Sequence, residues 1–411
     1  MIGTNITSPT IRALVVILIF FVTEFLGAIR LGPITIRHIA VVFMILYLLQ
    51  HKKSFIFLRM GAFRPLVLYF LFVSVLGLVN GLYEINGINL VFAYFLPSVT
   101  VVLFICNYVD DVQTFRYVLY GMLILVIINA IVTILQGVNH PLGWIISSFI
   151  HTQSHVQENI DKINTYSGDS IGLSIASGLQ GAVVANGYYL ASFGLLFILP
   201  MSKKATIKNV FISIIIFIII LIALFYNQQR SAFYVFIFLS ILLLANTISI
   251  KNSFFIVIIA LFISTLYPKS LSNINWGRLA DVDSSITQDR ASETSNYFGE
   301  YIWEGNNLLL GNSTTYRRLH DGFTPHNMFA ETTLQGGIFG LLIYMIFLYR
   351  LFSSMCFQFK KKNKITTCLI CTICAIILVS LTHSSGFHTG YTTAFYVYAY
   401  YELSKKYASY I

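Results

Sequence analysis

The sequence predicts an all-α polytopic membrane protein, and three observations lead to that prediction. Of the 411 residues, 57% are hydrophobic and only 10% are charged, whereas a soluble protein carries about 25% charged residues. Apolar stretches of about 20 residues recur from end to end, and each is long enough to cross a hydrocarbon core of ~30 Å. Stretches such as 210–225 are apolar on every side, which excludes the alternating pattern of a transmembrane β-barrel.

Reading the apolar stretches in order predicts about twelve transmembrane helices within a single domain, residues 1–411. They lie near 13–29, 34–50, 65–83, 86–106, 117–136, 178–200, 207–226, 231–249, 253–267, 328–349, 365–382 and 389–403. Arg12 precedes the first stretch, but no small-residue cleavage pattern follows it, so we expect an uncleaved span. The polar residues gather in two loops, a smaller one at 137–177 and a large one at 268–327 between spans nine and ten.

The distribution of charge predicts how the chain crosses the membrane. Most of the 26 basic residues fall in segments on one side, including the cluster at 360–364, whereas the opposite side is slightly acidic. Because positively charged loops stay in the cytoplasm, we expect both termini to be cytoplasmic and the two polar loops to lie outside. The net charge of +10 therefore reflects topology and not a nucleic-acid partner.

The cysteine and histidine patterns predict neither a disulfide nor a metal. The five cysteines lie within spans or on the cytoplasmic side. Three of them, at 368–374, have part of an iron–sulfur spacing but no fourth ligand, so we interpret them as small residues in a helix interface. His151, His155 and Glu158 have a spacing that could bind a metal, and a solvated loop explains them equally well.

Charged residues at membrane depth are functional candidates, because they are costly to keep there. Glu24, Arg37 and Arg230 are of this kind. Arg230 lies in the polar turn 226–232, between two strongly apolar stretches at the predicted outer face. The alternative is an interfacial arginine that reaches the lipid headgroups.

The segment that leads from the large loop into the tenth span contains a candidate general base. Thr324 suits an N-cap and Pro325 the first helical position, so His326 is expected in the first turn. A helix N-terminus disfavours the protonated imidazole, which leaves His326 able to accept a proton. The alternative is a histidine that bonds a loop carbonyl. His383 and His388 flank the last outer turn, and the sequence assigns them no role.

The large loop also contains arginines suited to a phosphate ligand. Guanidinium groups bind phosphate through paired donors, so outer arginines together with Arg230 suit a diphosphate. Aromatic residues at helical spacing predict a short helix near 289–304. Acidic residues share the loop and can pair with some arginines. We favour Arg290, with Arg278 in support, and interpret Arg317 and Arg318 as surface residues.

In their order, these residues resemble the bacterial O-antigen polymerase and O-antigen ligase superfamily (Wzy-like and WaaL-like). The matching residues are Arg230-Ser231, Arg290 followed by Trp303, Leu309-Leu310-Gly311, and His326-Asn327 with Glu331, Gly336-Gly337 and Gly340; Arg37 resembles an early arginine of the family. The chain departs from the family pattern at two places. It has Gln229-Arg230-Ser231 where the family has Ser-Arg-Gly, and Gly311-Asn312-Ser313 where the family has Gly-x-Gly.

The resemblance implies a GT-C-like glycosyltransferase of the bacterial inner membrane that takes its glycan from undecaprenyl diphosphate on the periplasmic side. It implies His326 as the base, and Arg230 and Arg290 as the residues that hold the diphosphate. Further substrate-binding residues would be Arg278, Arg37, Asn327, Glu331 and Trp303. The expected partners are the lipid-linked oligosaccharide, membrane lipid and a chain-length regulator protein, with no cofactor.

Three functions remain open at this point. A polymerase joins the glycan to a second lipid-linked repeat unit, whereas a ligase joins it to the lipid A core, and the motifs do not separate them. The richness in Phe, Tyr, Ile and Asn resembles polymerases of surface-polysaccharide clusters, which favours the polymerase. A lipid-linked oligosaccharide flippase or transporter would also use arginines, but it would keep them inside the helix bundle.

Overall fold

A computed structural model describes residues 8–27, 29–31, 34–50, 61–80, 96–151, 157, 176–203, 206–247, 295–296, 298–304, 307–312, 327–382 and 386–408. Within these residues the fold is helical, with thirteen α-helices and one two-stranded hairpin. Internal contacts divide the chain into two units. Unit 1 contains residues 1–118, 283–366 and 376–411, and unit 2 contains residues 119–282 and 367–375.

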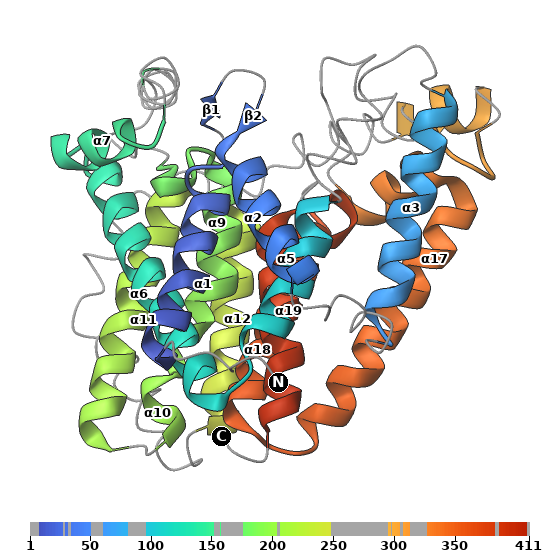
Figure 1. The fold of residues 1–411 in the computed structure, drawn as a ribbon. Helices are drawn as coiled ribbons and strands as arrows, with labels where there is room; N and C mark the ends of the chain where they lie inside the picture. Colours follow the sequence, from blue (N-terminus) through green and yellow to red (C-terminus); the bar gives the residue numbers. More distant parts are fainter. Residues whose placement is uncertain are drawn as a thin grey trace. The chain divides into compact units, whose positions relative to one another are not determined.

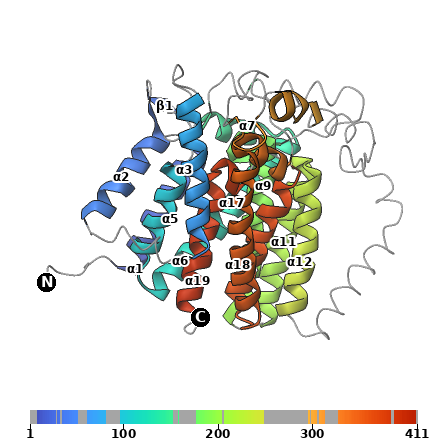
Figure 2. The same cartoon turned by 90° about the vertical axis from the view of Figure 1, so that its right-hand side faces the viewer.

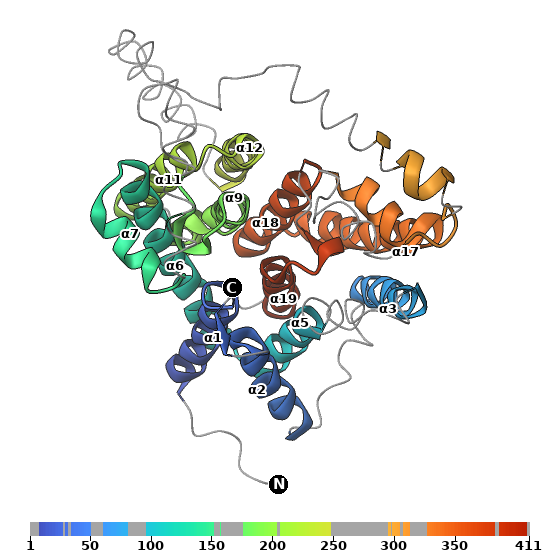
Figure 3. The same ribbon diagram turned by 90° about the horizontal axis from the view of Figure 1, so that it is seen from above.

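Unit 1 combines helices from both ends of the chain (Figure 1). Its elements are α1 (Pro9–Glu24), β1 (Arg30–Leu31), β2 (Ile34–Thr35), α2 (Ile36–Gln50), α3 (Phe63–Asn80), α5 (Leu96–Tyr108), η6 (Phe298–Glu304), α17 (Met328–Phe359), η7 (Phe387–Thr389) and α19 (Thr392–Tyr407). Helix α17 packs along α3 (Figure 2), and α19 packs along α5, which also contacts α2 (Figure 3).

Unit 2 is built around α9 (Val183–Phe193), which contacts both α11 (Ile207–Asn227) and α12 (Arg230–Thr247). Its other elements are α7 (Pro141–Ser148), η3 (Gly178–Gln180), η4 (Gly194–Ile198) and α10 (Pro200–Lys203). Helices α6 (Val112–Gly137) and α18 (Lys364–Ser380) have residues in both units. Helix α7 lies within the smaller polar loop, 137–177.

The helices have the length and surface of a multi-pass membrane protein. Four described segments are long and apolar enough to cross a bilayer: Val112–Gly137, Val183–Met201, Ile207–Asn227 and Met328–Phe359. Large apolar side chains remain exposed on several helices, for example Leu14 at 58%, Phe211 at 63% and Ile207 at 90%. Such a surface is unfavourable in water but suits contact with lipid tails.

Every predicted span that the structure describes contains helix, although the boundaries differ. The predicted span at 178–200 is divided into η3, α9, η4 and α10. The break has a local cause, because Pro200 has no N–H to donate and Gly194 lies directly against Ile220 and Phe236. The predicted span at 253–267 and the first part of 86–106 lie outside the described residues, so the number twelve stays a prediction.

Unit 1 has two chemically different ends. At the start of α1, Arg12 forms ion pairs with Asp110 and Asp111 at the junction of α5 and α6. At the other end of α1, Glu24 accepts a hydrogen bond from Thr393 at the start of α19. We call this second end the polar end. The candidate site described next lies there.

Candidate functional site

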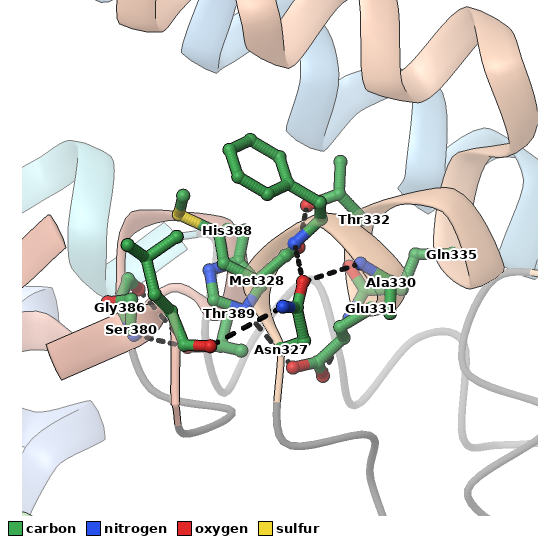
Figure 4. A network of polar contacts seen from close by, with 12 residues as sticks. Asn327, Met328, Ala330, Glu331, Thr332, Gln335, Ser380, Gly386, His388 and Thr389 are labelled. Carbon is green, nitrogen blue, oxygen red and sulfur yellow. Dashed lines mark hydrogen bonds and ion pairs between the residues drawn. The ribbon is translucent and has the colours of Figure 1, made fainter. Parts of the chain in front are cut away.

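Glu331 and His388 form a buried pair at the polar end of unit 1 (Figure 4). Glu331 lies in the first turn of α17, and His388 lies on η7. Nε2 of His388 is 3.1 Å from Oε2 of Glu331, and both side chains are 0% exposed. A carboxylate that contacts an imidazole nitrogen orients the ring and stabilises its protonated form. The pair is therefore chemically able to hold or transfer a proton.

Two further side chains position the Glu331 carboxylate. Nε2 of Gln335, one turn along α17, donates to Oε1 of Glu331 at 3.1 Å. Oε1 of Gln335 accepts from the Tyr69 hydroxyl of α3 at 2.7 Å. All three side chains are buried. The carboxylate thus has a partner on each oxygen, which fixes its orientation toward His388.

Asn327 caps α17 and connects it to α18. Its Oδ1 accepts from the N–H groups of Phe329 (2.9 Å) and Ala330 (3.2 Å), and its Nδ2 donates to the Leu381 carbonyl (3.4 Å). The prediction that Thr324 caps this helix, with His326 in its first turn, was wrong. The helix begins at Met328 because Asn327 satisfies its first N–H groups.

Helix α17 is interrupted one turn beyond the site. Gly337 has φ 59° and ψ −159°, outside helical values. The N–H of Ile338 donates to the Leu308 carbonyl at 2.9 Å, and the N–H of Asn312 donates to the Leu334 carbonyl at 2.8 Å. The segment 307–312 of the large loop therefore supplies backbone partners that the broken helix lacks.

The contact between the segment 307–312 and the break in α17 explains why both segments contain glycine. Gly311 has φ 70°, and a Cβ there would lie 2.7 Å from the N atom of Gly336. Side-chain packing supports the contact, since Ile302 of η6 and Leu334 of α17 are buried together. The segment 307–312 and the site-bearing turn of α17 are thus held together, which fixes Glu331 relative to this segment.

A second polar group at the same end contains Glu24 and Arg37. Nε of Arg37 donates to the Thr23 carbonyl at 3.1 Å, and the absence of a side chain at Gly27 leaves room for the guanidinium. Glu24 is 8% exposed, and Thr393 donates to one of its oxygens. Arg37 is thereby anchored through Nε, and its positive charge acts on the nearby Glu24 carboxyl.

Arg230 belongs to unit 2 and is described with that unit alone. It is the first residue of α12, directly after the left-handed residue Gln228 (φ 58°) and Gln229. Its side chain is half-buried. The position at the start of an apolar helix agrees with the prediction, whereas its phosphate ligand stays a prediction.

The structure brings some predicted site residues together and separates one from them. Asn327 and Glu331 share the first turn of α17, and Arg37 lies at the same end of unit 1. Trp303 on η6 is 63% exposed, so it contributes nothing to the buried pair. His326, Arg278 and Arg290 lie outside the described residues, as do His155 and Glu158 of the metal pattern.

The sequence reasoning missed the role of His388. From the sequence alone, His388 is only one of two histidines beside the last outer turn. A better signal was its setting between Gly386 and Gly390 at the start of a span, where the polar side chain of a membrane protein needs a buried partner.

Comparison with known proteins identifies no relative. No protein family model matches the chain, and no curated protein matches it.

Proposed function

We propose that the chain is an O-antigen (surface polysaccharide) polymerase of the bacterial inner membrane. In this proposal it transfers a glycan from undecaprenyl diphosphate to a second lipid-linked repeat unit on the periplasmic side. The observation that carries the proposal is the Glu331–His388 pair. Both ionisable side chains are 0% exposed, and His388 Nε2 lies 3.1 Å from Glu331 Oε2. Ionisable groups in membrane proteins are costly and mark functional sites.

Glycosyl transfer needs a group that accepts a proton. The acceptor hydroxyl loses its proton as its oxygen bonds to the anomeric carbon of the donor. The bond from that carbon to the diphosphate oxygen breaks, and the electron pair leaves with the diphosphate. We assign the proton to His326, which directly precedes Asn327 in the sequence. Glu331 and His388 balance the charge that develops as this proton moves.

The leaving diphosphate needs cations. Arg37 suits this role because its Nε is anchored on the Thr23 carbonyl, which fixes the direction of its guanidinium group. Arg230, Arg290 and Arg278 complete the proposed set. Guanidinium groups bind phosphate oxygens through two parallel hydrogen bonds, which holds the leaving group in a defined orientation.

A transporter of lipid-linked oligosaccharide is the second candidate, and one observation favours it. Helix α17 is broken at Gly337, close to the buried Glu331–His388 pair. Broken helices with polar groups at the break are a feature of secondary transporters. The loop segment 307–312 docked at this break, however, supplies the missing backbone bonds, as a fixed site requires.

A ligase differs from the polymerase only in its acceptor.

The glycolipids of a deletion strain test the proposal. Loss of a polymerase leaves lipid A core capped by a single repeat unit. Loss of the ligase leaves a bare core while long polymer accumulates on undecaprenyl diphosphate. Loss of the transporter leaves a bare core and unpolymerised repeat units on the lipid. The first result supports the proposal, and either of the others overturns it.

A further inference from the structure

A group of buried polar atoms in unit 2 has no hydrogen-bond partner among the described residues. All belong to the turn between α11 and α12: Asn227 Oδ1, Gln228 Oε1, both side-chain amide atoms of Gln229, and Ser231 Oγ. Asn227, Gln228 and Gln229 are 0%, 4% and 5% exposed. Buried polar groups in native proteins are nearly always hydrogen-bonded, so a cluster of exceptions calls for an explanation.

The orientation of two of these amides is fixed by bonds on their nitrogen side. Nδ2 of Asn227 donates to the carbonyls of Ala176 (2.8 Å) and Val183 (2.9 Å). Nε2 of Gln228 donates to the Phe225 carbonyl. Neither amide can be reversed without losing these bonds, so both oxygens remain acceptors that lack a donor.

Two of these unpaired oxygens lie against the same residue of α9. A Cβ at Gly187 would overlap both Gln229 Oε1 and Asn227 Oδ1, so the two oxygens face the same glycine. Reversing the Gln229 amide would turn its nitrogen toward Asn227 Oδ1. Gln229 Oε1, Gln228 Oε1 and Ser231 Oγ would still lack donors.

Part of the surrounding network is paired, although Ser177 Oγ, Gln180 Nε2, Ser213 Oγ and Ser240 Oγ of unit 2 also lack a partner among the described residues. Nδ2 of Asn129 donates to Oδ1 of Asn186 at 2.7 Å, and Nδ2 of Asn186 donates to Oγ1 of Thr133 at 3.1 Å. Asn186 also donates to the Ala176 carbonyl, the same group that holds Asn227. The turn thus holds the densest group of unpaired polar atoms in the described part of unit 2, beside a paired network that fixes its position.

The chemistry of the turn selects one kind of ligand. An excess of acceptor oxygens suits either a cation, which the oxygens can coordinate, or a molecule whose hydroxyl groups donate hydrogen bonds. Arg230 lies within the same turn, and its permanent positive charge repels a cation. We infer that the turn 227–231 binds the hydroxyl groups of a saccharide. This inference rests on the proposed function, because it places the donor glycan beside the diphosphate that Arg230 holds.

Two glutamine variants test whether the unpaired atoms await a ligand. Gln229→Met removes an amide that has no described partner, so the ligand-free protein should melt at the same temperature or higher. Gln136→Met is the matched control in unit 2. Gln136 is equally buried, but it accepts from the N–H of Gly178 at 2.8 Å and donates to the Gly178 carbonyl, so this variant should melt at a lower temperature. A clear loss of stability in Gln229→Met would show that the amide is paired internally and would overturn the inference.

Binding to purified protein completes the test with three probes. They are undecaprenyl diphosphate, the undecaprenyl-diphosphate-linked glycan extracted from a deletion strain, and the glycan released from that lipid by mild acid. The wild type should bind the glycosylated lipid about tenfold more tightly than the bare lipid. Gln229→Met should lose this difference and the binding of released glycan, while its affinity for bare lipid is unchanged.

The outcomes separate this inference from the proposed function. If both lipids bind and Gln229→Met keeps the difference in affinity between the glycosylated and the bare lipid, the inference is wrong and the proposed function stands. If released glycan binds through Gln229 but neither lipid binds, the inference stands and the proposed function fails. If no probe binds the wild type, both are overturned.

Discussion

Glu331 and His388 lie 57 residues apart in the sequence, yet His388 Nε2 and Glu331 Oε2 are 3.1 Å apart in a site closed to solvent. The contact joins the start of α17 to η7, the short helix that leads into α19. Because a single unpaired charge here would be strongly destabilising, the two groups stabilise each other. The contact is a buried ionisable pair at the polar end of unit 1.

The break in α17 requires glycine at 337. Gly337 has φ 59°, and a Cβ there would lie 2.6 Å from the Gly311 N atom. Gly337→Ala should therefore destabilise the protein by about 1–3 kcal/mol and displace the docked loop. Gly340→Ala is the control, because its nearest atoms are 3.6 Å or more away. Melting temperatures in detergent measure both effects, and equal values for the two variants would refute a strained, loop-docked break.

The sequence predicted the helices far better than the site. The long apolar runs of α11 and α12 end at polar residues, so their boundaries were readable. The start of α17 was not, because Thr324 and Asn327 are both good caps and the bond from Asn327 to the Leu381 carbonyl is a tertiary contact. The role of His388 was hidden for the same reason: its partner is on another helix, and no local pattern reports such a contact.

Arg37 should act through its guanidinium geometry and not only through its charge. Nε is bonded to the Thr23 carbonyl, which aims the terminal nitrogens. Arg37→Ala should raise the KM for the lipid-linked donor about tenfold or more, and Arg37→Lys should restore little, because an ammonium cannot make paired bonds. Arg64→Ala, at an exposed position on α3, is the control. Full activity in Arg37→Lys would show that only charge matters.

The opposite end of unit 1 should lose stability in acid. Partial burial raises the pKa of the Asp111 carboxyl, but hydrogen bonds from Thr114 and the charge of Arg12 lower it by more, so the net pKa is lowered. A lowered pKa in the folded state contributes stability that is present above the unfolded value of ~3.9 and is lost as the pH falls through the folded value.

This acid effect is measurable by comparing melting temperatures at neutral pH and below about pH 4. The wild type should lose more stability across this range than Asp111→Asn, which has no carboxyl to protonate. Because Asp111 is partly exposed, the difference should be small and should shrink in high salt. An identical pH dependence in the two proteins would contradict the role of the Arg12 pair.

The predicted topology is testable with introduced cysteines. Cys356, which is exposed, is first replaced by serine. Thr314→Cys should then react with a membrane-impermeant thiol reagent in cells whose outer membrane is permeabilised, whereas Lys361→Cys should not. The nearby Asn363 is left unchanged, because its Oδ1 caps α18 by accepting from the Thr366 N–H at 3.0 Å. The reverse labelling pattern would show that the topology is inverted and that the site faces the cytoplasm.

The most direct measurement of the central claim is the rate at which purified protein releases undecaprenyl diphosphate from lipid-linked repeat units. We expect Glu331→Gln and His388→Ala each to lower kcat by about 100-fold or more, as the loss of groups that balance developing charge does. Glu402→Gln is the matched control, since Glu402 pairs with Lys405 at the opposite end of unit 1 and should leave the rate unchanged. The account predicts slow, folded Glu331 and His388 variants beside a fully active control. Rates within about twofold of the wild type for both variants would contradict it.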